Sequence, residues 1–438
     1  MGGDSLLIRG GRVIDPASGY DAWADVLIRE GRIVAVGGDL VGADVPVLDS
    51  SNLIVCPGFV DLHTHLRYPG FPEKETIRTG TMAAAAGGFT TVCAMANTHP
   101  VVDSVEVLEN VRAAAEREGV ARVHQLAAVS CGLLGEQLTD MAALAAAGAP
   151  AFSDDGKPVW NENIMRQALR QSRALHLPIS VHEEDPELVR GGVANAGDRA
   201  RRQSLAEWPC AGEASMVARD VRLLGEEGGH LHVAHVSCAD TVRLIREAKA
   251  RGLRITAEAT PHHLRLTDRL LEGDAELGLP PAHPCTKVNP PLRCEADVEA
   301  LVEALADGTI DAVATDHAPH TASDKDMSYE DAAFGISAVE SALPLLLDLV
   351  RERRLDLVTL VERLTAGPAR AFGLHAGTLA PGEDADICVF DPVATWRLTP
   401  EAMVSRGKNT PLMGSLLRGR VVWTLVDGRV VWPSPAQR

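Results

Sequence analysis

The sequence predicts an α/β fold: a (β/α)8 TIM-like barrel plus a small composite β-sandwich domain that both ends of the chain build together. Three observations lead to this fold class. Aliphatic runs alternate with helical stretches eight times through the middle of the chain. Both ends instead contain short strand-like runs punctuated by Gly and Pro. The 438 residues suffice for one large barrel and a smaller domain.

The two end segments are expected to form hairpins. Strand-like runs near the N-terminus stop at Asp15-Pro16, Glu30-Gly31 and Gly37-Gly38, and the last hairpin turns at Asp427-Gly428. The middle of the chain lacks this pattern. We therefore assign residues 1–57 and 376–438 to one β domain and residues 58–375 to the barrel.

The middle segment supplies eight expected strands, beginning just before residue 58. They lie at residues 53–60, 89–95, 121–126, 149–153, 177–182, 230–235, 253–258 and 310–316. The expected helices lie at residues 76–87, 105–118, 141–147, 163–175, 213–226, 239–251 and 294–306. An open doubly wound sheet is the alternative, but no Gly-x-Gly-x-x-Gly loop supports a nucleotide site there.

Composition excludes several classes of function. A formal net charge of −18 argues against non-specific binding of nucleic acid or acidic membranes, because both need basic patches. The eight cysteines are scattered, without a Cys-x-x-Cys pair, which is typical of free thiols in a reducing cytoplasm. No signal peptide or membrane span is evident. We expect a cytoplasmic protein whose ligand is a small molecule.

A histidine pair marks the first strand end of the barrel. At a period of two residues per side, Asp61, His63 and His65 point to one face of the strand. Two histidines so spaced can bind one metal ion through neutral imidazole nitrogens. The alternative is a pair of core histidines that only form hydrogen bonds.

Further ligand-type residues recur at the carboxyl ends of later strands, where barrel enzymes carry their catalytic groups. Together with the first pair they form the set His63, His65, Asp154 or Asp155, His182, His235 and Asp316. Four imidazoles and two carboxylates suit two Zn²⁺-like ions, with one carboxylate bridging them. Such a pair activates water and polarises a carbonyl, and Asp316 could carry the proton to a leaving amide nitrogen. The predicted chemistry is hydrolysis of a C–N bond, or its reversal.

These motifs resemble the amidohydrolase superfamily and, within it, the long bacterial type I dihydroorotases. The resemblance covers essentially the whole chain. It rests on Asp61-x-His63-x-His65-Leu66-Arg67-x-Pro69-Gly70, Met95-Ala96-Asn97-Thr98, Phe152-Ser153-Asp154-Asp155-Gly156, Val181-His182-Glu183, Ala234-His235-Val236-Ser237, Lys287-Val288-Asn289-Pro290-Pro291-Leu292-Arg293, Ala314-Thr315-Asp316-His317-Ala318-Pro319-His320 and Lys408-Asn409-Thr410-Pro411.

The resemblance implies zinc-dependent, reversible cyclisation of N-carbamoyl-L-aspartate to (S)-dihydroorotate in pyrimidine biosynthesis. It implies one zinc on His63, His65 and Asp316, a second on His182 and His235, and a bridge through Asp155, with Asp154 as the alternative. Asp316 would be the catalytic residue. The implied substrate-binding set is Arg67, Asn97, Asn289, His320, Phe334 and Gly335. Arg67 suits the substrate carboxylate because a guanidinium pairs with it bidentately.

One departure and two alternatives accompany the resemblance. Tyr68 stands where the family usually has Glu, which leaves fine positioning of the substrate open. The alternative activities are hydantoinase, dihydropyrimidinase or allantoinase, against which Arg67, Asn97 and the absent bridging lysine argue. The other alternative is an inactive scaffold for aspartate carbamoyltransferase. A homodimer and a complex with that transferase are the expected assemblies.

Overall fold

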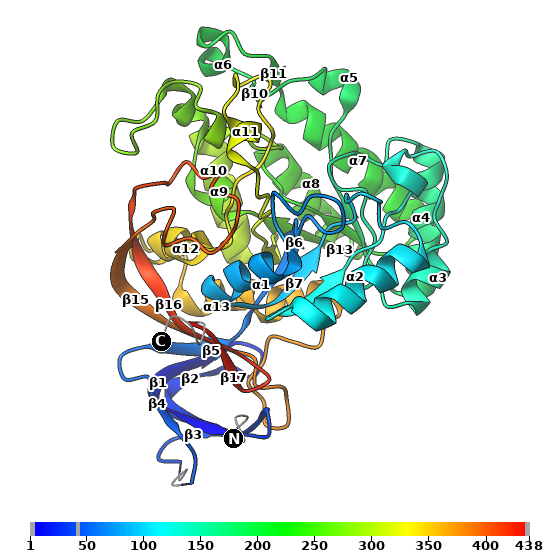
Figure 1. Ribbon diagram of the computed structural model, residues 1–438. Helices are drawn as coiled ribbons and strands as arrows, with labels where there is room; N and C mark the ends of the chain where they lie inside the picture. The colour runs from blue at the N-terminus through cyan, green and yellow to red at the C-terminus, as the bar shows by residue number, and fades with distance from the viewer. Residues whose placement is uncertain (1–4, 41–43, 434–438) are drawn as a thin grey trace.

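The computed structural model of the protein describes residues 5–40 and 44–433. Strands from both ends of the chain gather at the lower end of Figure 1, and an α/β part lies above them. Among the described residues, no helix combines the length and apolar character that crossing a membrane requires.

One eight-stranded sheet contains the strands of both chain ends. Its order is β17-β16-β15-β5-β1-β2-β3, and β4 pairs with β1 outside this path. The strands are β1 Leu6–Asp15, β2 Tyr20–Arg29, β3 Arg32–Gly37, β4 Val47–Asp49, β5 Ile54–Pro57, β15 Ile387–Arg397, β16 Leu416–Val426 and β17 Arg429–Trp432. The short strand β5 joins the two ends, because it pairs with β1 on one side and β15 on the other.

Seven parallel strands of the α/β part form two sheets. The strands β6 Phe59–Thr64, β7 Phe89–Ala94 and β8 Arg122–Gln125 make one sheet. The other contains β9 Ile179–Val181, β12 Leu231–Val233, β13 Ile255–Ala259 and β14 Ala312–Val313 in the order β14-β13-β12-β9. Isolated parallel bridges connect the sheets, through Phe152 at one edge and between Thr64 and His317 at the other.

The prediction of a strand at residues 149–153 was wrong in its extent, because the observed pairing is much shorter. Only Phe152 takes part in pairing, with Ala127 on one side and Ile179 on the other. Pro150 has no N–H to donate to a ladder, and the following residues turn toward the site described below. One residue that bridges to both neighbours therefore replaces the expected strand.

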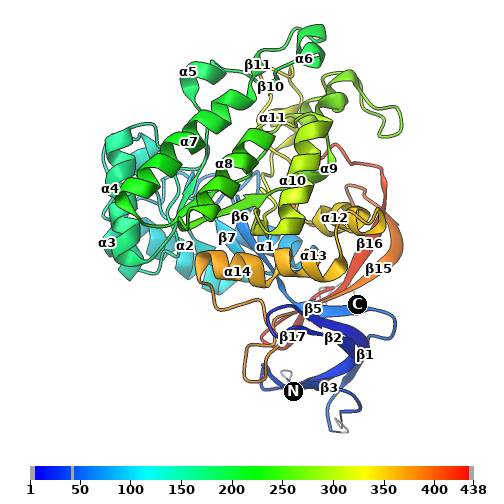
Figure 2. The ribbon, with the colours of Figure 1, turned by 180° about the vertical axis from the view of Figure 1, so that it is seen from behind.

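The seven predicted helices are present with small shifts of their ends. They are α1 Ile77–Ala86, α2 Val105–Glu118, α3 Met141–Ala146, α4 Glu162–Leu175, α7 Cys210–Glu227, α8 Ala239–Ala250 and α10 Glu295–Asp307. Figure 2 shows α7, α8 and α10 side by side on the outside. The helices α12 Ala342–Arg351, α13 Leu357–Leu364 and α14 Ala366–Phe372 follow β14 and were not predicted.

Short elements cover the end of the α/β part that lies away from the eight-stranded sheet (Figures 1 and 2). They include α5 Pro186–Val189, β10 Ala194–Asn195, α6 Asp198–Arg202 and β11 Glu207–Trp208, all in the connection after β9. The helix α11 Ala322–Lys325 lies in the connection after β14. All of these short elements thus belong to connections that follow the carboxyl ends of parallel strands.

Aromatic packing joins the α/β part to the eight-stranded sheet. Phe59 at the start of β6 makes an edge-to-face contact with Phe89, with ring centroids 5.5 Å apart, and a tilted contact with Phe390 of β15 at 6.2 Å. All three side chains are fully buried. This contact anchors β6, which carries the first histidine of the site, against the sheet.

Candidate metal and substrate site

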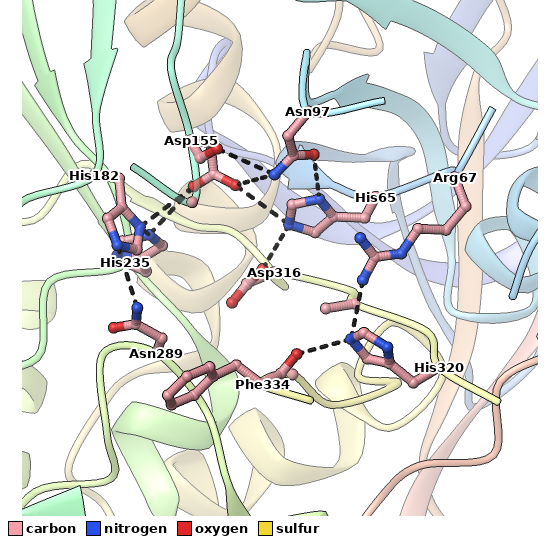
Figure 3. A pocket seen from close by; sticks show the side chains of 13 residues that line it. His65, Arg67, Asn97, Asp155, His182, His235, Asn289, Asp316, His320 and Phe334 are labelled. Atoms are coloured by element: carbon pink, nitrogen blue, oxygen red, sulfur yellow. Dashed lines mark hydrogen bonds and ion pairs between the residues drawn. The ribbon is translucent and has the colours of Figure 1, made fainter. Parts of the chain in front are cut away.

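The predicted ligands converge at the carboxyl ends of the parallel strands, and Figure 3 shows all of them except His63. His63 lies in β6 and His65 directly follows it, while His182, His235 and Asp316 follow β9, β12 and β14. Asp155 lies three residues after the bridging residue Phe152. All six side chains are buried.

Two groups of side chains share Asp155. His63, His65 and Asp155 place ligand atoms within 4.8 Å of one another, and so do Asp155, His182 and His235. Asp155 Oδ1 lies 3.3 Å from His63 Nε2 and 3.5 Å from His235 Nε2, and its Oδ2 lies 3.5 Å from His65 Nε2. The structure therefore places this carboxylate between the two histidine pairs.

Asp316 adds a carboxylate to the group of His63, His65 and Asp155. In the other group, the imidazoles of His182 and His235 are in close contact. Asp316 Oδ1 lies 3.1 Å from His65 Nε2 and 3.6 Å from His63 Nε2. His182 Nδ1 and His235 Nε2 lie 3.0 Å apart.

The neighbouring Asp154 points elsewhere. Its carboxylate accepts hydrogen bonds from the backbone N–H groups of Val129 and Ser130, at 2.8 and 3.0 Å, and from the Ser130 hydroxyl. Asp154 therefore fixes the loop, whereas Asp155 faces the histidines.

Three polar residues determine which imidazole nitrogens carry protons. Glu258 Oε1 lies 2.9 Å from His63 Nδ1, Asn97 Oδ1 lies 3.1 Å from His65 Nδ1, and Glu184 Oε2 lies 3.2 Å from His182 Nε2. These oxygens accept hydrogen bonds from the N–H groups of the facing ring nitrogens. The opposite nitrogen of each ring then presents a lone pair to the centre of the site.

Electrostatics favour positive charge on His63 and His182, whereas burial lowers the pKa of His65. Burial alone lowers the pKa of His63, but the Asp155 carboxylate outweighs it and the pKa lies well above its ordinary value. Burial likewise opposes charge on His182, yet hydrogen bonds with Asp155 and Glu184 raise its pKa to about 10. Burial raises the pKa of Asp316, but His65 and His63 more than reverse this effect and hold the carboxyl ionised.

The backbone is strained at two candidate metal ligands, His235 and Asp316, and at the predicted substrate-binding residue Arg67. Arg67, His235 and Asp316 have φ values of 57°, 34° and 46°, in the left-handed region that non-glycine residues rarely occupy. Such strain costs on the order of 1–3 kcal/mol per residue and persists where the surrounding structure enforces it, often at functional sites. The sharp turns direct these side chains inward directly after β6, β12 and β14.

The donor set fits divalent metal ions of the zinc type. His63 Nε2 is buried and has no hydrogen-bond partner among the described residues, although Glu258 fixes the proton of this ring on the other nitrogen. A buried ring nitrogen that faces the carboxylates of Asp155 and Asp316 favours a bound cation, either a proton or a metal ion. Imidazole nitrogens and carboxylate oxygens are ligands that Zn²⁺ accepts.

A pocket of about 200 Å³ opens beside this cluster. The predicted substrate-binding residues all line it, and so do the predicted metal ligands except His63. Its lining is His65, Arg67, Asn97, Asp155, Gly156, His182, His235, Asn289, Asp316, Ala318, His320, Phe334 and Gly335.

Arg67 and His320 form one corner of the pocket. Arg67 Nε donates to the Pro319 carbonyl at 3.2 Å, and its Nη2 lies 3.2 Å from His320 Nε2. His320 Nε2 also lies 2.8 Å from the Phe334 carbonyl, to which it donates. Burial and then the Arg67 charge lower the pKa of His320 to about 3, so the ring is neutral.

The Arg67 guanidinium has no carboxylate partner in this corner. Among the described residues, no Asp or Glu oxygen lies within 4.0 Å of it, although Asp316 and Asp155 attract it from farther away. A half-buried guanidinium facing a pocket without an ion pair is a ready site for an anionic group.

Asn97 and Asn289 are both tied to the metal-ligand cluster. Asn97 Nδ2 donates to the Asp155 carbonyl and to Asp155 Oδ2, both at 3.1 Å, in addition to accepting from His65. Asn289 Nδ2 donates to Glu184 Oε2 at 2.9 Å. These asparagines therefore orient ligands as well as lining the pocket.

The sequence reasoning missed Glu258 and Glu184. Glu258 ends the seventh predicted strand, the same kind of position that identified the histidines, and this signal could have revealed it. Glu184 lies two residues after His182, beyond the strand end, where sequence offers no such signal. Tyr68, the unusual residue, points away: its hydroxyl donates to Asn110 of α2 at 3.1 Å, and it does not line the pocket.

Comparisons with known proteins identify the family to which this chain is similar. Residues 54–431 match the model of the Amidohydrolase family. A dihydroorotase of Anaeromyxobacter sp. (strain K) is 51% identical over 429 residues, which cover 98% of each chain. A dihydroorotase of Pelotomaculum thermopropionicum is 47% identical over 427 residues, covering 97% of this chain and 98% of that protein. Among solved structures, the L-hydantoinase (dihydropyrimidinase) of Arthrobacter aurescens is similar with a TM-score of 0.86 at 26% identity, covering 97% of this chain and 95% of that one.

Proposed function

The chain belongs to the amidohydrolase family, and on that premise we propose that it catalyses the dihydroorotase reaction, the reversible cyclisation of N-carbamoyl-L-aspartate to (S)-dihydroorotate in pyrimidine biosynthesis. The protein is a hydrolase of cyclic amide C–N bonds. Relatives named dihydroorotase match nearly its whole length at 43–52% identity. The single observation within the site that supports this substrate is the Arg67 guanidinium, which faces the pocket without a carboxylate partner.

Two zinc ions per chain are the proposed cofactor. His63, His65 and Asp316 would hold one ion, His182 and His235 the other, and Asp155 would bridge them. Bound zinc lowers the pKa of water to near neutrality and polarises an amide carbonyl. The type I assignment also belongs to this proposal, and the Asp154-Asp155-Gly156 sequence in place of a bridging lysine supports it.

The chain's own residues orient the substrate and move its protons. Arg67 binds the carboxylate at C6 of dihydroorotate, and His320, Asn289 and the backbone of Phe334 and Gly335 bound the ring. Asp316 faces the pocket, where its carboxylate oxygens can accept a proton from the attacking water. It returns that proton to the ring nitrogen as the C–N bond breaks, which yields N-carbamoyl-L-aspartate. Cyclisation follows the same path in reverse.

We infer that the fold is a (β/α)8 barrel with a composite β domain. The bridges at Phe152 and between Thr64 and His317 support closure of the two parallel sheets into a ring. The strand β5, which pairs with strands from both ends, supports a domain of residues 1–57 and 376–438 beside a catalytic domain of residues 58–375.

A comparison of substrates tests the proposed activity. We expect the zinc-supplied protein to hydrolyse dihydroorotate and to be inactive toward 5,6-dihydrouracil, hydantoin and allantoin, which lack the carboxylate that Arg67 would bind. Activity on any of the last three without activity on dihydroorotate would contradict the proposal. A protein without bound metal that stays inactive after zinc is supplied would favour the scaffold alternative.

Cytoplasmic location, a homodimer and a complex with aspartate carbamoyltransferase remain predictions. A sharp rise in dihydroorotase activity on adding the transferase would support that complex. Sedimentation of the isolated chain measures its oligomeric state.

A further inference from the structure

Asn409 lies outside the residues assigned above, yet its side chain reaches two walls of the pocket. It belongs to the Lys408-Asn409-Thr410-Pro411 motif, in the connection between β15 and β16. Its Oδ1 accepts hydrogen bonds from His320 N and Ser337 Oγ, both at 2.8 Å. Its Nδ2 donates to the carbonyls of Ala318 and Gly335, both at 3.0 Å.

These four contacts use the hydrogen-bonding capacity of the amide fully. An amide offers two acceptor and two donor positions, and each has a partner here. Asn409 is 4% exposed, so removing the amide would take a buried hydrogen-bond partner from the His320 N–H and from the carbonyls of Ala318 and Gly335. The backbone also contributes, because Ser337 N donates to the Asn409 carbonyl at 2.9 Å.

The two segments that Asn409 connects both enter the pocket. One carries Ala318 and His320, and the other carries Phe334 and Gly335. They are packed closely: a Cβ atom built on Gly335 would lie 2.5 Å from the Ala318 Cβ, and Gly335 has a φ of 125°. Small displacements between these segments therefore change the shape of the pocket directly.

Gly407, in the same connection between β15 and β16, packs closely against the segment that carries Ala318 and His320. A Cβ atom on Gly407 would lie 2.6 Å from the Pro319 Cβ and 2.8 Å from His320 N. The Gly407 carbonyl also accepts a hydrogen bond from Ser337 Oγ at 2.9 Å. Residues 407–409 thus pack directly against Pro319 and His320 of the pocket wall.

We propose that Asn409 is a positioning residue that clamps the two substrate-binding segments together and so sets affinity for the carboxylate-bearing substrate. It acts through His320, whose ring bonds the Phe334 carbonyl and contacts Arg67. The inference rests on the proposed dihydroorotase function. It assigns a role in the site to a residue of the connection between β15 and β16.

Asn409→Asp tests the clamp with almost no change in volume. A carboxylate would face the carbonyls of Ala318 and Gly335 without a proton to donate, so the two segments should separate. We expect the KM for dihydroorotate to rise roughly tenfold or more, kcat to change less than KM, and the zinc content to stay at the parent value.

The matched control is Asn195→Asp. Asn195 is also buried and uses both ends of its amide, donating to Asp268 Oδ2 at 2.8 Å and accepting from Arg293 Nη1 at 3.0 Å, but it does not line the pocket. We expect its Tm to fall while KM stays within about twofold of the parent. Equal KM values for the two variants would overturn the proposal, and so would a fall in kcat at unchanged KM in Asn409→Asp.

Gly407→Ala keeps the test decisive if Asn409→Asp does not fold. The added methyl group pushes on Pro319 and His320 without altering a residue that lines the pocket. A raised KM with unchanged zinc content would support the clamp, and parent-like kinetics would overturn it. The unsubstituted parent protein tests the proposed function separately. If the parent does not turn over dihydroorotate, the proposed function is wrong. If the parent is active and the variants keep its KM, only the role of Asn409 is wrong.

Discussion

Glu258 offers the sharpest test of how the chain prepares its metal ligands. Its side chain is 1% exposed and accepts from His63 Nδ1 at 2.9 Å and from His232 Nε2 at 3.0 Å. His232 Nδ1 in turn contacts Thr256 Oγ1 at 2.9 Å. This buried chain of bonds fixes the proton of His63 on Nδ1 and leaves Nε2 for the metal.

Two substitutions of Glu258 should weaken zinc binding in a graded way. Gln keeps one acceptor for His63 and loses the charge, and the difference between charged and neutral hydrogen bonds is about 1 kcal/mol, or roughly fivefold in affinity. Leu removes both acceptors. We expect a loss of about 10–100-fold in zinc affinity for that variant, the range typical when a partner behind a metal ligand is lost. It should also lower the free energy of unfolding by about 2–6 kcal/mol, because two buried N–H groups lose their partners.

Competition between the metal-free protein and a chromogenic chelator at fixed pH measures these affinities. Glu340→Gln is a suitable control, since Glu340 is a buried carboxylate whose hydrogen bonds come from the backbone of Val404 and Ser405, away from the histidines. Parent-like zinc affinity in both Glu258 variants would refute the argument that Glu258 prepares His63.

Three further predictions address binding, chemistry and stability. Arg67→Met should raise the KM for dihydroorotate by about 10–100-fold at unchanged zinc content, because a charged hydrogen bond contributes about 1.5–3 kcal/mol; an unchanged KM in steady-state assays would remove Arg67 from the site. Asp316→Ala should abolish turnover while the circular dichroism spectrum stays native, and near-full activity would exclude Asp316 as the proton carrier. Burial raises the pKa of Glu340 to about 7, so the folded protein keeps a proton that the unfolded chain releases above its ordinary pKa of 4.5. The stability from this proton is full below about pH 4.5 and is lost as pH rises through 7, about 3 kcal/mol in all. Urea unfolding of Glu340→Gln and the parent from pH 5 to 8 should therefore show a difference that grows in favour of the variant, and a constant difference would contradict the assignment.

The alternation of aliphatic runs and helical stretches was sufficient to predict most elements of the α/β part. The helix α2 begins and ends at the predicted residues, and β7 differs from its predicted range by one residue. The strand predicted at 149–153 was too long because Pro150 has no N–H to donate and the chain turns at residues 155–157, which the aliphatic pattern does not show. The helices after β14 were not predicted, although α13 has a clearly amphipathic sequence.

The sequence by itself determined which residue types end the parallel strands, and hence the set of four histidines and two carboxylates. Strand ends in such a fold meet at one face, so spacing along the chain was enough to bring these residues together. Tertiary structure decided how each side chain is oriented and paired. It turned Asp155 toward the histidines and Asp154 away, and it brought Glu258 behind His63.

Distant segments set the remaining features of the site. Asn409 reaches the pocket from a connection about 90 residues beyond His320, and Tyr68 turns toward α2 instead of the substrate. The physical reason is that side-chain direction depends on backbone torsions and on partners far away in sequence, as the left-handed conformations of Arg67 and Asp316 show. No local sequence pattern predicts the direction of a side chain, whereas the residue type alone determines which donor atoms it offers to a metal.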